Sequence, residues 1–297
     1  MTGKIKTEIL VLFLIALLSA IIYSNSLRNP FHFDDTHHII DNPYLKSLRH
    51  IPDIFTDTRA FSVWEGNNRH YRPLLLLTHS INYAIGGLKP AGYRLVNLTF
   101  HAGSAFLIFL IVQAMLGSSK EVAGSRKSEV RSKKLEVRSQ KLEVRSQIFS
   151  SNFLPLTSYF YIAFTAGLIF AVHPFNSEVV NYISARSSVM SSFFYLLAFY
   201  YWMKFRSQRQ APPTYYLLPT TYYYIASLLV FLAGMLTKEI VITLPIILWC
   251  YDHYFLPGKK GKAGFANYVK GFIIYTPFLL LVAFPYVVVR NLVVGSR

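Results

Sequence analysis

The 297-residue sequence has little cysteine and little negative charge. Its one cysteine, Cys250, excludes an intrachain disulfide, so cysteine gives no information about the compartment in which the chain folds. Only 14 acidic residues stand against 30 Lys and Arg, and charged residues make up 15% of the chain. What is abundant is apolar: 53% of the residues are hydrophobic and the mean hydropathy is +0.35, which is too high for an ordinary soluble domain.

Long apolar stretches dominate the sequence, whereas the alternating pattern of a membrane β-barrel strand is missing. A helix needs roughly 20 mostly apolar residues to cross a hydrocarbon core about 30 Å thick. Seven stretches meet or approach that length: Ile9–Ser26, Tyr93–Leu116, Leu156–Val172, Val189–Met203, Tyr222–Leu236, Ile240–Tyr254 and Phe272–Val289. The sequence therefore predicts an all-α, polytopic transmembrane helix bundle in a lipid bilayer.

The positions of the Lys and Arg residues predict the orientation of these spans. They gather before the first span and between alternate later spans, and cytoplasmic loops are the ones enriched in Lys and Arg. We therefore expect a cytoplasmic amino terminus and a large first extracytoplasmic loop from Leu27 to Gly92. A cleavable signal peptide over the first stretch, preceded by Lys4 and Lys6, is the alternative. Since the basic residues are split among loops and lack interleaved aromatics, we expect no nucleic-acid partner.

Residues 117–155 have the composition of an insertion within a single transmembrane domain that covers residues 1–297. The hexapeptide LEVRSQ begins at Leu135 and again at Leu142, which makes a seven-residue period. A coiled coil needs apolar residues three and four apart, but Leu and Val are here two and five apart, so no seam forms. We expect a basic, solvated, low-complexity cytoplasmic loop without a catalytic role, with weak docking on anionic lipid headgroups as the alternative.

Reactive side chains follow the first span directly, in the run Phe33-Asp34-Asp35-Thr36-His37-His38. Two adjacent carboxylates cannot both ionise freely, so the pKa of one should rise unless a cation or a metal offsets the repulsion. His and Asp are suitable metal ligands, but their spacing here specifies no metal, and a divalent ion is left open as a cofactor. The alternative is a solvated loop in which Asp34 or Asp35 caps a short helix.

Ionisable residues also flank later spans on the extracytoplasmic side. The motif His70-Tyr71-Arg72-Pro73 precedes an apolar run, Leu74 to Ile85, that is too short to span. The stretch His173 to Glu178 and Arg186 lie between the third and fourth spans, and Lys238-Glu239 lies between the fifth and sixth. Ionisable groups at such depth are costly and usually functional, although a snorkelling cation or a structural ion pair is the alternative for each.

Carboxylates and cations from different spans are thus expected at one membrane surface. The carboxylates are Asp34, Asp35 and Glu178, and the cations are Arg72, Arg186 and Lys238. Transfer of a sugar from a lipid-linked phosphate needs this combination, because a base must take the acceptor proton and cations must hold the departing phosphate. A lipid-linked sugar transporter is a rival, but its charges would lie along a path through the bundle. A non-catalytic membrane assembly subunit is a second rival.

These motifs, in this order, resemble the membrane half of the transmembrane and tetratricopeptide-repeat O-mannosyltransferases, which are related to the protein O-mannosyltransferases and other GT-C glycosyltransferases. The run Phe33 to His37 is similar to the family's first-loop pattern Phe-Asp-Glu-Val-His, with Asp35 in place of Glu. The resemblance implies a bundle of GT-C type in which Asp34 is the base and Asp35 an auxiliary group. It makes three cations the candidate partners of the donor phosphate: Arg72, Arg186 and Lys238. Glu178 is expected to join Asp34 and Asp35 as a catalytic carboxylate, and other residues of the same motifs are expected to assist: His37, His173, Tyr71 and Glu239.

The resemblance also implies an inverting transferase. Its donor would be a polyprenyl- or dolichyl-phosphate sugar with a mannose-like sugar, and its acceptor a hydroxyl of a protein or a glycan at the extracytoplasmic face. The chain would lie in a bacterial cytoplasmic membrane or, in a eukaryote, in the endoplasmic reticulum. The family continues into helical repeats of about 34 residues, and this sequence contains none, so we expect the chain to be the amino-terminal part of a longer protein.

Overall fold

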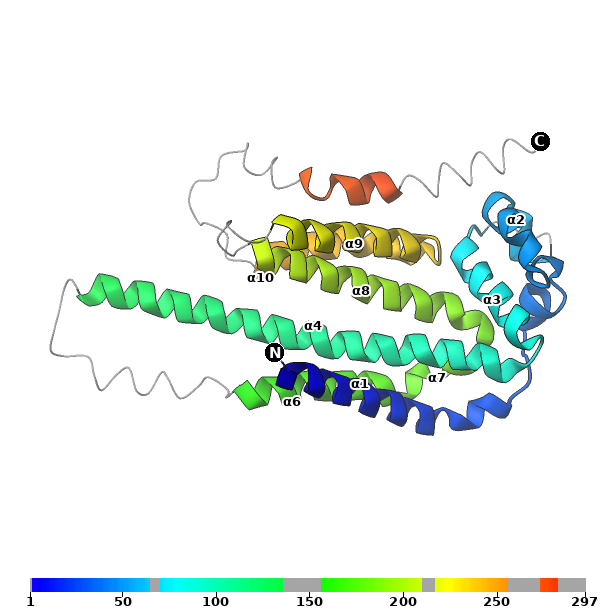
Figure 1. Cartoon of the computed structure of the whole chain (residues 1–297), viewed down its shortest axis with the longest axis horizontal. Helices are drawn as coiled ribbons and strands as arrows, with labels where there is room; N and C mark the ends of the chain where they lie inside the picture. The colour runs from blue at the N-terminus through cyan, green and yellow to red at the C-terminus, as the bar shows by residue number, and fades with distance from the viewer. Residues whose placement is uncertain (1, 65–69, 136–155, 210–216, 256–272, 283–297) are drawn as a thin grey trace.

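The computed structural model describes residues 2–64, 70–135, 156–209, 217–255 and 273–282. These residues form helices of several kinds, and no strand occurs among them, which confirms the all-α class. The long helices are α1 (Thr2–Ile22), α4 (Pro90–Leu135), α6 (Leu156–Val172), α8 (Arg186–Arg209), α9 (Leu217–Met235) and α10 (Leu244–Phe255). In Figure 1 they lie side by side along the long axis of the molecule.

Helix α4 is the centre of this bundle. It packs against α1, α6 and α8, and α8 in turn packs against α9. Small residues let α4 and α6 approach closely: a Cβ added at Gly167 would lie 3.0 Å from the carbonyl oxygen of Ala105. Close backbone approach at small residues is typical of helices that associate within a membrane, where water does not drive helices together.

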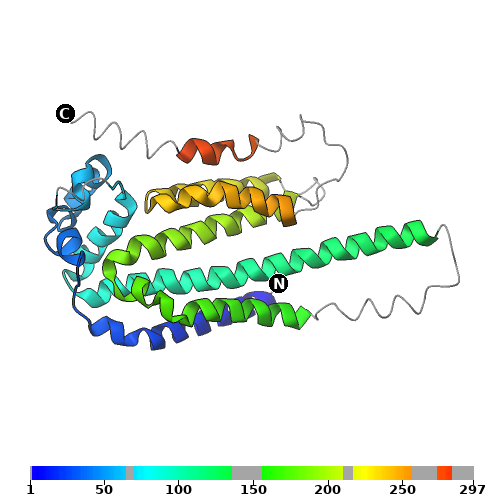
Figure 2. The same ribbon diagram turned by 180° about the vertical axis from the view of Figure 1, so that it is seen from behind.

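The segment between α1 and α4 folds into short elements that we call the cap, residues 24–64 and 70–86. Its elements are η1 (Ser24–Arg28), η2 (Thr36–Ile40), η3 (Pro43–Leu45), η4 (Leu48–His50), α2 (Ile51–Thr56), η5 (Thr58–Phe61) and α3 (Pro73–Gly86). Short polar side chains begin several of these turns, because Asn42, Ser47 and Asp57 each accept a backbone N–H two residues later. Figures 1 and 2 show α2 and α3 together at one end of the bundle.

Two further links join the cap at that end. Between α6 and α8 lie η7 (Pro174–Asn176), α7 (Ser177–Asn181) and η8 (Ile183–Ala185), and η9 (Glu239–Thr243) connects α9 to α10. Helix α7 packs against α4 and against η1 of the cap. All the segments that were expected on the extracytoplasmic side are therefore gathered at one end of the molecule.

Several helix bounds differ from the predicted spans, and the differences in α4 and α10 have a clear local cause. Helix α4 begins at Pro90, a residue tolerated in a first turn, and continues past Gly117 to Leu135, because the Lys, Glu, Ala and Arg residues there are good helix formers. Residues 136–155 of the predicted insertion lie outside the described residues. The span predicted to begin at Ile240 is α-helical only from Leu244 onward, where α10 begins. The α-helix does not begin earlier because Pro245 has no N–H to donate to a carbonyl in the preceding turn.

Among the described residues, one helix is both long and apolar enough to cross a membrane: Pro90–Gly117 of α4, with a mean hydropathy of 2.0. A second span results if Ser158–Val172 and Pro174–Asn181, which meet at a bend of 48°, are taken together. The segment Thr220–Met235 is apolar but shorter. The predicted number of seven spans therefore stays a prediction, and residues 272 and 283–289 of the last predicted span, Phe272 to Val289, lie outside the described residues.

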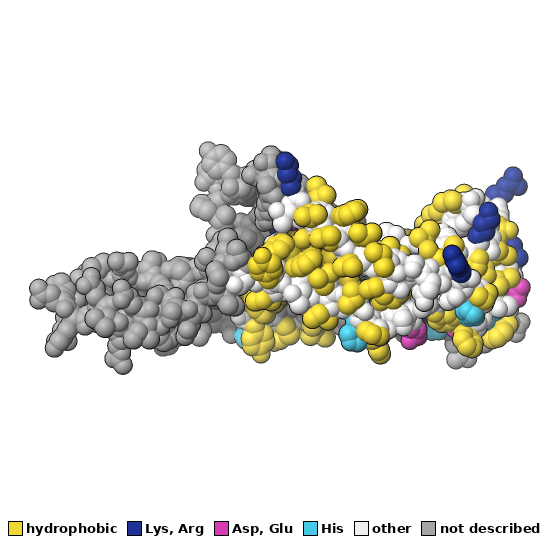
Figure 3. All heavy atoms as spheres, turned by 90° about the horizontal axis from the view of Figure 1, so that it is seen from below, with side chains coloured by type: hydrophobic (Ala, Val, Ile, Leu, Met, Phe, Trp, Pro, Cys, Tyr) yellow, Lys and Arg dark blue, Asp and Glu magenta, His cyan; other side chains and the backbone are white. Residues whose placement is uncertain are grey.

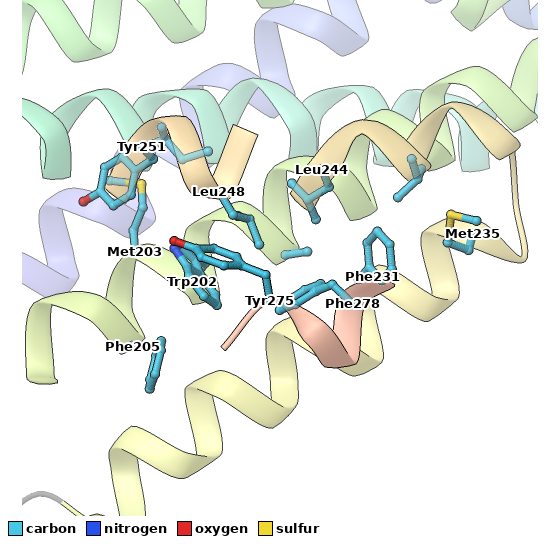
Figure 4. Packing of buried hydrophobic residues seen from close by; sticks show 13 residues of the cluster. Trp202, Met203, Phe205, Phe231, Met235, Leu244, Leu248, Tyr251, Tyr275 and Phe278 are labelled. Atoms are coloured by element: carbon cyan, nitrogen blue, oxygen red, sulfur yellow. The ribbon is translucent and has the colours of Figure 1, made fainter. Parts of the chain in front are cut away.

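The largest cluster of buried hydrophobic residues lies between α8, α9, α10 and residues 273–282. Trp202 of α8 is fully buried at its centre, with Tyr275 and Phe278 against it (Figure 4). A carboxylate holds this region together: Asp252 accepts a hydrogen bond of 3.1 Å from Trp202 Nε1 and another from the Tyr275 hydroxyl. Arg206 Nε lies 3.1 Å from the same carboxylate. Asp252 therefore ties α8 and α10 to the segment that follows.

We predict that Asp252→Asn lowers the stability of the bundle. The side chains of Asp252 and Arg206 are only 9% and 23% exposed, and loss of one partner of a buried ion pair costs about 3 kcal/mol. The control is Asp53→Asn, whose carboxylate pairs with His50 but is 49% exposed. Unfolding midpoints of the two variants, measured in detergent, should differ clearly; equal midpoints would contradict the proposed role of Asp252.

Candidate functional site

The two adjacent carboxylates at the start of the cap have opposite surroundings. Asp35 is fully buried, and its Oδ1 accepts hydrogen bonds from the backbone N–H of Ser184 at 2.9 Å and from the Ser184 hydroxyl at 2.6 Å. Its Oδ2 accepts a third, of 3.0 Å, from the N–H of His32. The side chain of Asp34 is 54% exposed. Asp35 therefore holds the cap against η8, whereas Asp34 is accessible to a ligand.

The backbone just before this pair is strained. Phe33 has φ of 48°, in the left-handed region that aromatic residues rarely occupy. The turn is closed by a hydrogen bond of 3.0 Å from Asp35 N–H to the carbonyl of His32, and the Phe33 ring meets Tyr182 edge to face. Such strain persists only where the surroundings enforce it, and it concentrates at functional sites. The strained residue lies directly before the two carboxylates.

Two buried arginines lie behind the carboxylate pair. Arg94 of α4 donates to the carbonyl oxygens of Asn29, Pro30 and Asn181. Arg186, at the start of α8, donates to Asn97 Oδ1 at 2.9 Å and to the carbonyl of Tyr93 at 2.7 Å.

Both guanidinium groups are fully buried, and the negative charge of Asp35 acts on both. Together the three side chains fix the cap and the α6–α8 link on the end of α4. Arg186 thus lies behind the site, among groups that position it.

The surroundings of Asp34 favour its ionised form. A hydrogen bond from the Tyr182 hydroxyl lowers the pKa of Asp34, and His37 and His38 add to this effect. The rise in pKa expected for one member of an adjacent pair does not occur at Asp34, because the carboxylates turn apart and these donors offset the repulsion. Burial and the bond to Asp34 raise the pKa of Tyr182 to about 12, so its hydroxyl stays protonated as a donor.

Two histidines of the short π-helical turn η2 stand beside Asp34. His37 is buried, with Nε2 at 3.4 Å from Asp34 Oδ1, Nδ1 at 2.9 Å from Ser62 Oγ, and its ring stacked on Trp64. Burial lowers the pKa of His38 to about 4, so this ring is neutral at pH 7. One ligand atom from each of Asp34, His37 and His38 lies within 4.8 Å of the other two. This group could therefore hold a metal ion.

Arg72 and Glu239 meet although they are far apart in the sequence. Pro73 begins α3, and the N–H of Leu74 donates to the carbonyl of Leu236 at 3.2 Å, which places the start of α3 beside the end of α9. Arg72 Nη2 then donates to Glu239 Oε2 at 2.9 Å, and Nε to Oε1 at 3.3 Å. Burial alone would raise the pKa of Glu239, but its contacts with Arg72 hold that pKa below the ordinary value.

Lys238, Tyr71 and His173 make local contacts. Lys238 Nζ donates to Ser188 Oγ at 2.8 Å, and burial lowers the pKa of this amine. The Tyr71 hydroxyl donates to the carbonyl of Phe55 at 3.0 Å, which secures α2. His173 Nδ1 accepts the N–H of Phe175 at 3.2 Å at the start of η7. These three residues do not line either of the two cavities described next.

Two cavities flank Asp34, and both are lined by Asp34 and Tyr182. The first, of about 260 Å³, is polar and holds the cation Arg72; its other lining residues are His38, Phe61, His70, Leu75, Leu76, His79 and Ser184. The second, of about 550 Å³, is more open and more apolar; its other lining residues are Asn29, His32, Phe33, Glu178 and Asn181. The structure therefore brings Asp34 and Arg72 to one cavity and places Glu178 in the other.

Sequence reasoning missed Tyr182, Ser184 and Ser62, and it did not single out His38. Tyr182 is one of 21 tyrosines in the chain, so its residue type alone gives no indication of a functional role. His70 could have been found, because it opens the motif that contains Arg72. The partners of a carboxylate from another element become visible only in the folded chain.

Comparison with known proteins shows that this chain is similar to proteins named as O-mannosyl-transferases. Protein O-mannosyl-transferase Tmtc1 of Drosophila melanogaster is 31% identical over 103 residues, which are 34% of this chain and 12% of that protein. Protein O-mannosyl-transferase TMTC3 of Homo sapiens is 26% identical over 176 residues, 57% of this chain and 14% of that protein. Protein O-mannosyl-transferase Tmtc3 of Drosophila melanogaster is 28% identical over 202 residues, 64% of this chain and 19% of that protein.

The resemblance read from the motifs is thereby confirmed, and the chain spans less than a fifth of the length of these relatives. No family model and no solved structure matches the chain.

We predict that Asp35→Asn destabilises the protein much more than Asp34→Asn. Asp35 is buried between hydrogen-bond donors and two arginines, and loss of a charge in such a setting costs about 3 kcal/mol, whereas Asp34 faces solvent. Thermal unfolding of both variants in detergent measures the difference. A midpoint for Asp35→Asn equal to that of Asp34→Asn would show that the buried carboxylate is dispensable for the cap.

Proposed function

We propose, from the similarity to protein O-mannosyl-transferases and from the geometry around Asp34, that this chain is the membrane-embedded transferase part of an O-mannosyltransferase-like enzyme. It transfers a mannose-like sugar from a polyprenyl-phosphate donor to a hydroxyl of a Ser or Thr in a protein. The reaction takes place at the end of the bundle that carries the cap, which is the extracytoplasmic end.

The observation that carries this proposal is the position of Asp34 between two cavities of different character. The first cavity offers Arg72 and His70, which suit a phosphate. Glu239 engages Nε and Nη2 of Arg72, and Nη1 is the donor that would reach a phosphate oxygen. The second cavity is open and bordered by the exposed ring of Phe33, which suits an acceptor peptide that enters from outside. Asp34 lies where the two substrates would meet.

In the proposed reaction Asp34 acts as the general base. The acceptor oxygen attacks the anomeric carbon of the sugar, its proton passes to the Asp34 carboxylate, and the bond from that carbon to the phosphate oxygen breaks. The electron pair leaves with the polyprenyl phosphate, whose charge Arg72 neutralises. A single displacement of this kind inverts the anomeric centre. The Tyr182 hydroxyl accepts the backbone N–H of Asp34 at 3.2 Å, and its effect on the carboxylate lowers the pKa of Asp34, which keeps the base ionised.

Exposed apolar surface along the bundle supports the same proposal. Large apolar side chains of α1 are exposed along most of its length, including Ile9, Phe13 and Ile21 at 59–60%. In Figure 3 hydrophobic side chains cover most of the middle of the described surface, while Lys and Arg appear toward its edges and ends. Surface of this kind is costly in water and ordinary against lipid tails. A lipid-linked donor would then reach the first cavity from the bilayer.

A lipid-linked sugar transporter fits the geometry less well. A transport path needs polar groups along the bundle, near the middle of the membrane. The groups that line the first cavity gather instead around Asp34 and Arg72. A non-catalytic assembly subunit is distinguished by the activity test below.

We predict that Asp34→Asn lowers sugar transfer by about 10²- to 10⁴-fold, because a positioned general base is worth that factor. The assay is transfer from radiolabelled polyprenyl-phosphate mannose to Ser- and Thr-containing peptides in membranes that contain the protein.

Arg72→Ala should mainly raise the KM for the donor, since it removes a charge-assisted phosphate contact. Matched controls in the cap are Asp53→Asn, from a second His–Asp pair, and Arg59→Ala, from an exposed ion pair. Full transfer by Asp34→Asn would overturn the assignment of the base, and no transfer by the unaltered protein to any peptide would favour the assembly role.

We also predict the orientation of the chain in the membrane. In a Cys250→Ala background, a cysteine at the exposed position Lys46 of the cap should react with an impermeant thiol reagent applied from the extracytoplasmic side. A cysteine at Ser132, beyond the predicted span in α4, should react only after the membrane is opened. Labelling of both positions in intact cells or sealed vesicles would contradict this orientation.

A further inference from the structure

The strongest additional feature is the group formed by Asp34, His37 and His38 on the wall of the first cavity. One carboxylate oxygen and two imidazole nitrogens lie within 4.8 Å of one another, and one approach, from His37 Nε2 to Asp34 Oδ1, is 3.4 Å. That distance is long for a charge-assisted hydrogen bond. It equals the spacing of about 3.3–3.4 Å between two ligands of a tetrahedral ion that each lie about 2.0–2.1 Å from the metal.

The surroundings of His37 prepare its ring as a metal ligand. Ser62 Oγ lies 2.9 Å from Nδ1, and when it accepts the Nδ1 proton the lone pair of Nε2 faces Asp34. The ring is also held in plane by stacking on Trp64, with ring centres 4.0 Å apart. A second group that fixes the tautomer and orientation of a histidine is what metal-binding histidines have in most sites.

His38 supplies an independent observation. Its Nε2 is buried and has no hydrogen-bond partner in the structure. A buried polar atom without a partner is costly, so it normally indicates a bound water, an ion or a catalytic role. The His38 ring also lines the first cavity and packs on Phe61, which fixes its direction.

We propose that Asp34, His37 and His38 bind one divalent transition-metal ion, with Zn²⁺ as the best match. Two imidazole nitrogens and one carboxylate favour Zn²⁺ over Mg²⁺ or Ca²⁺, which prefer oxygen ligands. Three protein ligands leave at least one position of the ion open, as in catalytic zinc sites. Asp34 and His38 line the cavity that also holds His70 and Arg72, so a bound ion would be within reach of a ligand in that cavity.

Binding of the ion does not depend on the proposed transfer reaction. If that reaction takes place here, the ion adds positive charge next to Arg72, where the donor phosphate would lie. Asp34 has two oxygens, so it can hold the ion with one and accept a proton with the other. This second role rests on the proposed function, and the experiment below tests binding alone, without donor or acceptor.

The experiment is titration of the chelator-stripped, purified chain in nanodiscs with Zn²⁺, with Mg²⁺ in parallel, and determination of the metal content after desalting. We expect one Zn²⁺ per chain and much weaker binding of Mg²⁺.

Ser62→Ala should weaken Zn²⁺ binding by about 10- to 100-fold, because it removes the orienting partner of His37. His38→Gln should weaken it by more than that, because it removes a ligand. The matched control is His50→Gln, from the His50–Asp53 pair, which has the same spacing of three residues as Asp34 and His37 and should leave binding unchanged.

A second measurement guards against variants that fail to fold. X-ray absorption at the zinc edge of the unaltered protein should show two imidazole nitrogens and at least one oxygen, without sulfur from Cys250. Failure of the unaltered chain to retain Zn²⁺ would overturn the proposal. So would a folded His38→Gln variant that binds Zn²⁺ as tightly as the unaltered chain, or an absorption spectrum without imidazole. Zn²⁺ binding without sugar transfer would leave the site in place and contradict only the proposed function.

Discussion

The structure depends on buried charge at the capped end of α4. Arg94 and Arg186 enter the protein interior at that end, and a guanidinium group taken out of water must find acceptors for its donors. They find them largely in backbone carbonyls of Asn29, Pro30, Asn181 and Tyr93, and the Asp35 carboxylate supplies negative charge for both. Because these carbonyls belong to segments far apart in the sequence, satisfying the arginines fixes the cap and the α6–α8 link in one arrangement.

In that arrangement the two adjacent aspartates have different roles. Asp35 is committed to Ser184, His32 and the arginines, so it is not available to a substrate. Asp34 lies directly after the strained Phe33, beside Tyr182 and two histidines. The same fold brings Arg72 and Glu239 together although they are 167 residues apart in the sequence. This packing results in a site with one accessible carboxylate and one nearby cation.

The fold was predictable from the sequence to a large extent, and the site only in part. Apolar runs placed the helices α4, α6, α8 and α9, because long apolar segments form helices whenever their backbone must be satisfied internally. The helical continuation of α4 to Leu135 and the late start of α10 at Leu244 were not predicted, since they depend on local propensity and on Pro245 rather than on hydropathy. The motifs singled out Asp34 and Arg72, which line one cavity, but they did not distinguish these two from Asp35 and Arg186, which are buried.

The sequence by itself determined the all-helical class, the gathering of ionisable motifs between apolar runs, and the similarity to protein O-mannosyl-transferases. These properties are local in the chain: hydropathy, charge and motif order are present whether or not it is folded. Only the tertiary structure decided which carboxylate is accessible, which arginine reaches a cavity, and that Tyr182, Ser62 and His38 surround Asp34. The physical reason is that burial and hydrogen-bond partners are set by contacts between distant segments, and identical side chains such as Asp34 and Asp35 differ in nothing else.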